Sequence, residues 1–197
     1  QTLGREVTLA EIYAHPALRG NDPAAECAAE LAMIAPNRPV AQAAEACHAR
    51  GQKVYAVSDM YLPKEQIEAM LQKCGLDFLD GVFVSCEYGV QKRSGKLFKL
   101  FLQQTALRPA EVLFVGDSPR ADFAGAALAG IRCFLLPQPT PLPYTKTPAD
   151  AVGGAAIATL QNCCQNLNPS VALGAELLGP LAVGFATWLH GQRSAIP

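Results

Sequence analysis

The sequence predicts an α/β fold in which helices cover both faces of a parallel β-sheet, giving three layers. The first observation is the alternation of short apolar runs with helical segments, which is typical of right-handed βαβ units. The second is that two of these runs, KVYAVSDMY and EVLFVGDSP, end in a small residue, an aspartate and a hydroxyl. Parallel sheets bind ligands at the carboxyl ends of their strands. The two endings therefore predict one polar site at one edge of the sheet.

The first fifty residues predict a small helical region. Residues 8–15 read TLAEIYAH, and the spacing of Thr8 and Glu11 indicates a capping box at a helix start. Residues 24–34 and 39–50 are rich in strong helix formers, and Gly51 ends the second of these helices.

Strands and helices alternate after this region. The expected strands are short runs with β-branched or aromatic residues, at 53–57, 81–85, 112–115 and 131–136. The expected helices are 63–73, 95–107 and 119–129. The first has proline at its first position, Ser94 is a candidate cap for the second, and Gly130 closes the third.

Composition excludes several classes of protein. The chain has 197 residues, of which 50% are hydrophobic and 17% are charged, so it predicts a packed globular protein rather than a disordered one. The net charge of -1 leaves no excess of basic residues to bind nucleic acid, so no nucleic-acid partner is expected. The seven cysteines include no CxxC pair, which favours free thiols in a reducing cytoplasm over a zinc site or a disulfide framework.

The C-terminal part differs in character. Residues 138–170 begin with a proline-rich stretch and predict a linker followed by an irregular or helical segment. The segment 171–189, within a final region 171–197, is apolar and long enough to cross a bilayer, but Glu176 and Pro180 interrupt it. A helix that docks on a further domain or partner is therefore preferred over a membrane span.

The candidate site combines residues from three strand ends. Ser58 and Asp59 follow the first strand, Lys92 lies in the loop after the second, and Asp117 and Asp122 follow the third. A hydroxyl, a lysine and paired carboxylates are the groups that phosphoryl transfer with Mg²⁺ needs. Taken one at a time, these residues have simpler explanations, because aspartates and serines cap helices and loop lysines are usually solvated.

The combination resembles the haloacid dehalogenase (HAD) superfamily of hydrolases. VYAVSDMYLP is similar to the second motif of that family, SCEYGVQKRSGKLF to its third region and VLFVGDSPRADFAGA to its fourth motif, of the form GDSxxxD. The third region has an aromatic residue six positions after its lysine, and Lys92 with Phe98 satisfies this spacing whereas Lys96 does not. The resemblance covers residues 1–137.

The resemblance implies a role for each site residue. Ser58 and Asp59 would bind the phosphoryl group, and Lys92 would stabilise its charge and that of a covalent intermediate. Asp117 would be a Mg²⁺ ligand and Asp122 a second acidic partner of the metal site. Residues 1–51 would be the helical cap that controls substrate access, and residues 52–137 the Rossmann-like core.

The nucleophile of the family is not found in the sequence. It is the first aspartate of a DxD motif on a strand that lies at the centre of the sheet, and no DxD precedes Ser58. We therefore expect either a fragment of a longer protein or a degenerate family member, and prefer the fragment. The chain alone is expected to be inactive and to fold poorly, or to leave the strands 53–57 and 112–115 unpaired.

The predicted function is Mg²⁺-dependent hydrolysis of a small phosphate monoester through an aspartyl-phosphate. The alternative is a non-catalytic module that binds a phosphorylated ligand or docks beside another domain. SDMYLP and the apolar C-terminal segment resemble parts of large bacterial multidomain proteins, some of which are linked to glycosyltransferases. A P-loop or dinucleotide-binding protein is excluded, because neither GxxxxGK[ST] nor GxGxxG is present.

Overall fold

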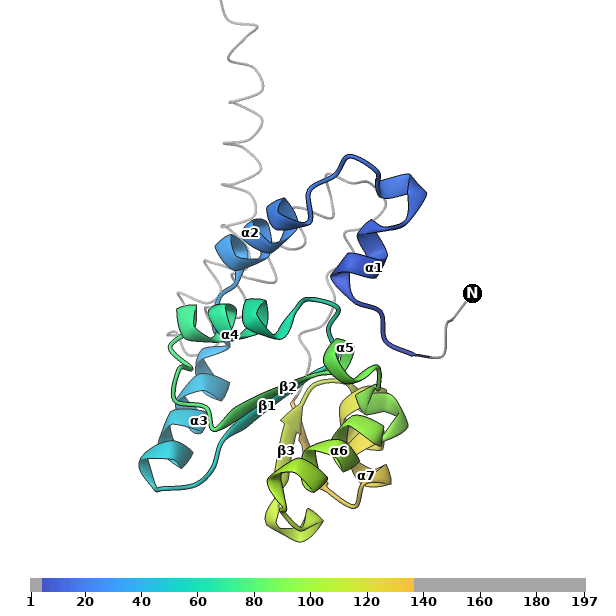
Figure 1. Ribbon diagram of the computed structural model, residues 1–197. Helices are drawn as coiled ribbons and strands as arrows, with labels where there is room; N and C mark the ends of the chain where they lie inside the picture. Colours follow the sequence, from blue (N-terminus) through green and yellow to red (C-terminus); the bar gives the residue numbers. More distant parts are fainter. Residues whose placement is uncertain (1–4, 137–197) are drawn as a thin grey trace, which may run out of the picture. The chain divides into compact units, whose positions relative to one another are not determined.

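The computed structural model describes residues 5–136 of the chain (Figure 1). Most of them belong to one compact unit, made of residues 5–34 and 44–136, while residues 35–43 are assigned to a second unit. The linker predicted at 138–170 and the apolar segment at 171–189 lie outside the described residues.

The N-terminal region is helical, as predicted. Helix α1 (Leu9–Tyr13) begins with the expected capping box, in which the Thr8 hydroxyl accepts from the Glu11 N–H and the Glu11 carboxylate accepts from the Thr8 N–H. A short 3₁₀ turn, η1 (Pro16–Leu18), leads to helix α2 (Pro23–Met33), whose first turn is capped by Asp22. Helix α3 (Arg38–Ala49) ends at Gly51, where the backbone takes the left-handed conformation with φ +75°.

Within residues 5–136, four strands form two separate two-stranded sheets, each with parallel pairing. Strand β1 (Tyr55–Ser58) pairs with β2 (Gly81–Val84), and β3 (Leu113–Gly116) pairs with β4 (Arg132–Leu135). Among residues 5–136, β1 and β3 are not partners, so the expected separation of these two strands is confirmed. Figure 1 shows β1 and β2 side by side, with β3 apart from them.

The β1–β2 sheet has a core on each face. Val82 and Val84 of β2 pack with helix α4 (Lys64–Lys73) and with Leu9 of α1. Phe83 points to the opposite face, where it packs with helix α6 (Lys96–Thr105) and helix α7 (Gly125–Leu128). This alternation along one strand gives helix, sheet and helix layers, as predicted for a parallel sheet buried on both faces.

Several boundaries differ from those predicted. Ser85, expected at the end of the second strand, begins a short helix, α5 (Ser85–Tyr88). The helix expected at 119–129 is divided into a wider π-helical turn, η4 (Pro119–Ala124), and α7. Helix α6 starts at Gly95 in the left-handed conformation rather than with a cap by Ser94, which lies in the 3₁₀ turn η2 (Lys92–Ser94). A further 3₁₀ turn, η3 (Pro109–Glu111), precedes β3.

The described residues also bear on two other expectations. The five cysteines among them are free, as predicted, and Cys163 and Cys164 lie outside the described residues. Within residues 5–136, no helix has the length and hydropathy that a membrane crossing requires.

Candidate active site

The residues predicted for the site lie at the carboxyl ends of β1 and β3. Ser58 is the last residue of β1, where it is paired in register with Val84, and it is half-buried. Its hydroxyl makes no hydrogen bond within residues 5–136, so it remains available to a ligand oxygen. Asp59 follows directly, and Asp117 occupies the equivalent place after Gly116 at the end of β3.

An ion pair joins the turn after β2 to the turn after β3. Lys92 Nζ lies 2.6 Å from Asp122 Oδ1, and the side chains are 13% and 4% exposed, respectively. The contact is an ion pair without the alignment of a regular hydrogen bond, since Asp122 Oδ1 has no such bond. Lys92 Nζ also lies 5.5 Å from the centre of the Phe114 ring, within the range of a cation–π contact.

The second oxygen of Asp122 organises the loop after β3. Asp122 Oδ2 accepts hydrogen bonds from the backbone N–H groups of Asp117 and Ser118, each at 2.9 Å. Burial alone would raise the pKa of Asp122, but Lys92 and these two N–H groups outweigh it and lower the pKa below its usual value. Asp122 is therefore an ionised, buried carboxylate whose two oxygens are both engaged.

Glycine at position 116 is required by the same carboxylate. A Cβ atom built on Gly116 would lie 2.5 Å from Asp122 Cγ, too close for any side chain to be tolerated without movement. The wide π-helical turn η4, in which the Phe123 N–H donates to the Ser118 carbonyl at 3.1 Å, brings Asp122 into this position. The G and the second D of the GDSxxxD motif thus depend on each other physically.

Asp59 is linked to the same network through the backbone of Lys92. The Lys92 N–H donates to Asp59 Oδ1 at 2.8 Å. Burial raises the pKa of Asp59, and the Lys92 N–H and charge only partly offset this effect. One residue, Lys92, therefore contacts the loop after β1 through its backbone and the loop after β3 through its side chain.

Two further glycines let the Lys92 turn approach the helix that follows η4. A Cβ atom on Gly125 would lie 2.8 Å from the backbone carbonyl carbon of Lys92. Gly95, with φ +71°, would place a Cβ atom 2.8 Å from Leu128 Cβ. The close approach to the Lys92 backbone therefore requires glycine at position 125.

Some candidate residues take no part in this network. Lys96 is exposed on the first turn of α6. Glu87 is exposed on α5.

Ser85, which sequence reasoning did not assign, is fully buried and accepts a hydrogen bond from the Met60 N–H at 2.9 Å. A serine directly after an apolar strand was the only signal that could have identified it.

The donor set suits a hard cation only in part. Within residues 5–136, no group of three or more His, Cys, Asp or Glu side chains is arranged to hold a metal ion. Asp122 is engaged by Lys92 and two N–H groups, and Asp117 is the other carboxylate that the family resemblance assigns to the metal site. Because Mg²⁺ binds with one or two protein carboxylates and keeps several water or substrate oxygens, a site built around Asp117 fits this ion.

Comparison with known proteins agrees with this arrangement of motifs. A family model described as haloacid dehalogenase-like hydrolase matches residues 3–130, more than half of the chain. The match spans the helical region, strands β1 to β3 and all five predicted site residues, and ends before β4.

Three curated proteins are similar over shorter stretches. The haloacid dehalogenase-like hydrolase domain-containing protein 3 of Bos taurus is 32% identical over 97 residues, covering 49% of this chain and 38% of that protein. A phosphoserine phosphatase of Thermus thermophilus is 41% identical over 51 residues, covering 26% of this chain and 20% of that protein. A ribulose-1,5-bisphosphate 5-phosphatase of Halopiger xanaduensis is 38% identical over 69 residues, covering 34% of this chain and 29% of that protein. The matched stretches thus cover well under half of each relative.

A solved structure shows the same fold. The crystal structure of a protein assigned as a β-phosphoglucomutase, from Thermotoga maritima, superposes with a TM-score of 0.50 at 16% identity, covering 64% of this chain and 56% of that one. At this identity the likeness concerns the fold alone.

Proposed function

The chain belongs to the haloacid dehalogenase-like hydrolases, and we propose that it carries part of the active site of a Mg²⁺-dependent phosphohydrolase. The observation that carries this proposal is the continuous set of contacts from Asp59 through Lys92 and Asp122 to the backbone of the loop after β3. It holds a nearly buried ammonium that could stabilise the charge of a phosphate group.

Each residue has a chemical task in the proposed reaction. The Ser58 hydroxyl donates a hydrogen bond to a phosphoryl oxygen, and the Lys92 ammonium stabilises the negative charge that moves during transfer. Asp122 keeps Lys92 in place, because its own carboxylate is fixed by two backbone N–H groups. This differs from the role expected from the family resemblance, in which Asp122 serves the metal.

Asp117 would hold Mg²⁺ together with water and substrate oxygens. When bound, the ion neutralises charge on the phosphate and so favours attack by an anionic nucleophile. Asp59, with its raised pKa, lies beside the phosphate position and would accept or donate a hydrogen bond there.

The attacking carboxylate is assigned to residues outside 5–136. A strand placed between β1 and β3 would pair with both open edges and would end at the same edge of the sheet as Ser58 and Asp117. Attack by its aspartate on phosphorus releases the alcohol and leaves an aspartyl-phosphate, and water then hydrolyses this intermediate to inorganic phosphate.

The names of two relatives support a small phosphorylated substrate. They are named as phosphatases of phosphoserine and of ribulose-1,5-bisphosphate, both small phosphate esters. The substrate of this chain is proposed only at that level, since each match covers well under half of the relative.

The test is hydrolysis of p-nitrophenyl phosphate by the full-length protein with Mg²⁺. Lys92→Ala and Asp117→Asn are each expected to lower kcat/KM by about 100-fold or more, as for loss of a transition-state stabiliser. Lys96→Ala, four residues from Lys92 on the exposed side of α6, is the matched control and should leave the rate unchanged. Full activity of Asp117→Asn would overturn the metal assignment. Phosphate binding without hydrolysis by the wild type would favour the non-catalytic alternative.

A further inference from the structure

A carboxylate from the N-terminal stretch reaches the core beside the candidate site. Glu6 precedes α1 and is half-buried. Its two oxygens accept hydrogen bonds from different segments: Oε2 from the Ser85 hydroxyl at 3.1 Å and Oε1 from the Gln91 side-chain amide at 2.5 Å. Neither the motif pattern nor the proposed reaction assigns Glu6 a role.

Each of the two partners of Glu6 is connected to a predicted site residue, Ser85 by a hydrogen bond to the neighbouring residue and Gln91 by its place in the chain. The Ser85 hydroxyl accepts from the N–H of Met60, which directly follows Asp59. Gln91 directly precedes Lys92, whose N–H donates to Asp59. A single carboxylate is therefore connected through Ser85 to the loop that carries Ser58 and Asp59, and contacts the turn that carries Lys92 through Gln91.

The hydrogen-bond arrangement at Ser85 depends on the acceptor oxygen that Glu6 provides. The Ser85 hydroxyl has one proton, and it can donate either to Glu6 or to the Met60 carbonyl at 3.3 Å. The charged acceptor forms the stronger bond, so the proton points to Glu6 and a lone pair is left for the Met60 N–H. Without Glu6, the hydroxyl would turn to the Met60 carbonyl and the bond to the Met60 N–H would weaken.

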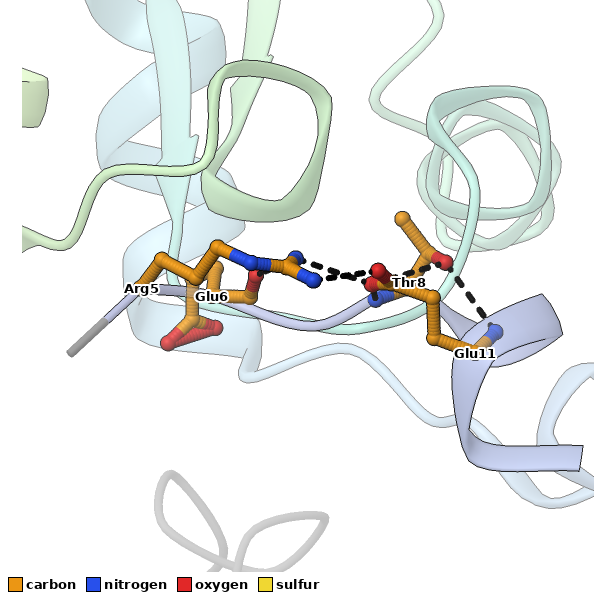
Figure 2. A network of polar contacts seen from close by, with 4 residues as sticks. All are labelled: Arg5, Glu6, Thr8 and Glu11. Carbon is orange, nitrogen blue, oxygen red and sulfur yellow. Dashed lines mark hydrogen bonds and ion pairs between the residues drawn. The ribbon is translucent and has the colours of Figure 1, made fainter. Parts of the chain in front are cut away.

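The backbone around Glu6 is itself fixed. The Arg5 guanidinium donates to the Glu6 carbonyl at 3.0 Å and forms an ion pair with Glu11, the residue that completes the capping box of α1. Figure 2 shows this network, with Arg5 reaching along the stretch to Glu11 and the Glu6 carboxylate lying apart from it. At the other end of the stretch, the Leu9 N–H donates to the Tyr61 carbonyl at 2.8 Å.

From these contacts we infer that Glu6 is a positioning residue, which holds the Ser58–Asp59 loop and the Lys92 turn in one fixed relation through Ser85 and Gln91. The inference rests on the proposed function, because the two loops are the phosphate-binding parts of that site. It also gives the helical region a direct part in the geometry of the site, beyond controlling substrate access.

Three variants of the full-length protein test the inference with p-nitrophenyl phosphate. Glu6→Ala removes both contacts and is expected to lower kcat by about tenfold or more with little change in KM, since misplaced groups weaken transition-state contacts. Glu6→Gln should stay within about threefold of the wild type, because its amide can accept from Ser85 and donate to a flipped Gln91 amide. Gln91→Ala, which removes one contact only, should lie between the two.

Two outcomes of these rates would overturn the inference. Equal losses in Glu6→Gln and Glu6→Ala would show that the charge of Glu6, rather than its connections, matters. An unchanged kcat in a Glu6→Ala protein whose melting temperature has fallen would show a purely structural role. Glu45→Ala, an exposed acidic residue on α3, is the matched control. If Glu6→Ala does not fold, Glu6→Gln and Gln91→Ala still decide the question.

A readout independent of turnover separates this inference from the proposed function. The backbone amides of Met60 and Lys92 are hydrogen-bonded to Ser85 and Asp59. Their hydrogen exchange should quicken by about tenfold in Glu6→Ala and stay unchanged in Glu45→Ala. Equal exchange in Glu6→Ala and wild type would overturn the positioning role. If exchange quickens in Glu6→Ala as expected but the wild type hydrolyses no ester, the proposed function alone would be overturned.

Discussion

Lys92 and Asp122 form the one ion pair within residues 5–136 in which both side chains are nearly buried, with Nζ and Oδ1 2.6 Å apart. The two residues follow strands of different sheets, so the pair links the β1–β2 half of the core to the β3–β4 half. Because removing one partner of a buried pair leaves an uncompensated charge, this link can be tested directly by substitution.

Lys92→Met and Asp122→Asn are each expected to lower the free energy of unfolding by about 3 kcal/mol, whereas the double variant should lose clearly less than the sum. Urea denaturation of the full-length protein measures this. Lys53→Met is the control, since Lys53 is 68% exposed in its pair with Asp80 and should lose at most about 1 kcal/mol. Additive losses in the double variant would show that the pair is not coupled.

The glycines around this pair should not tolerate a methyl group. The added Cβ atom would clash with the Asp122 side chain in Gly116→Ala and with the Lys92 backbone in Gly125→Ala. Each substitution should lower the free energy of unfolding by about 1–3 kcal/mol. Gly81→Ala is the matched control, because its Cβ atom would meet the Tyr55 ring at an ordinary 3.4 Å. Thermal unfolding compares the three variants, and equal melting temperatures would contradict the close approach seen here.

Alkaline pH should release the contact between the helical region and the loop after β1. The Glu26 carboxylate accepts from the hydroxyls of Tyr13 at 2.7 Å and Tyr61 at 2.6 Å, and its hydrogen bond raises the pKa of Tyr61 to about 12. The pKa in the folded state thus exceeds the unfolded value of 10.0, so the stabilisation is complete below pH 10 and is lost as the pH rises towards 12.

Melting temperatures of wild type and Tyr61→Phe between about pH 8 and about pH 12 measure this effect. The wild type should be more stable at the lower end, and the difference should shrink above pH 10, where the Tyr61 hydroxyl of the unfolded chain ionises while that of the folded protein is still protonated. Tyr88→Phe, which removes a hydroxyl 3.4 Å from Gln104, controls for the loss of a tyrosine hydroxyl. A difference that does not change with pH would contradict the assignment to Glu26.

Removal of divalent metal should abolish phosphatase activity of the full-length protein, and Mg²⁺ should restore it. Asp117→Asn should raise the Mg²⁺ concentration needed for half-maximal activity by about tenfold or more, because it removes a charged ligand. Ser58→Ala should instead raise the KM for p-nitrophenyl phosphate and leave the Mg²⁺ requirement unchanged. A shift in Mg²⁺ requirement for Ser58→Ala alone would reverse the two assignments.

The order of elements was predictable because it depends on local signals. The capping box at Thr8 and Glu11 and the glycine stop at Gly51 each act over a few residues, and both were found as expected. The boundary at Ser85 and the division of the helix after Pro119 were not, because a buried hydroxyl contact and the position of Asp122 override local helix preference there.

Contacts within the site were only partly predictable. The sequence indicated that Lys92 and Asp122 share an edge of the sheet, and the role of Asp122 in a metal site stays a prediction. It did not indicate that the two Asp122 oxygens contact Lys92 and two backbone N–H groups. Glu6 carried no motif, so no pattern could connect it with Ser85 and Gln91, which are 79 and 85 residues away along the chain.

The sequence by itself determined that this protein has polar residues at the ends of parallel strands, since apolar runs, glycines and aspartates fix strand ends and turns through short-range sterics and hydrogen bonding. Only the tertiary structure decided which partner each polar group has. Packing on the two faces of β2 brings distant segments together. A carboxylate buried there needs hydrogen-bond or ion-pair donors, and the tertiary structure decides which donors lie close enough. For Asp122 that donor is Lys92, and for Glu6 it is Ser85 and Gln91.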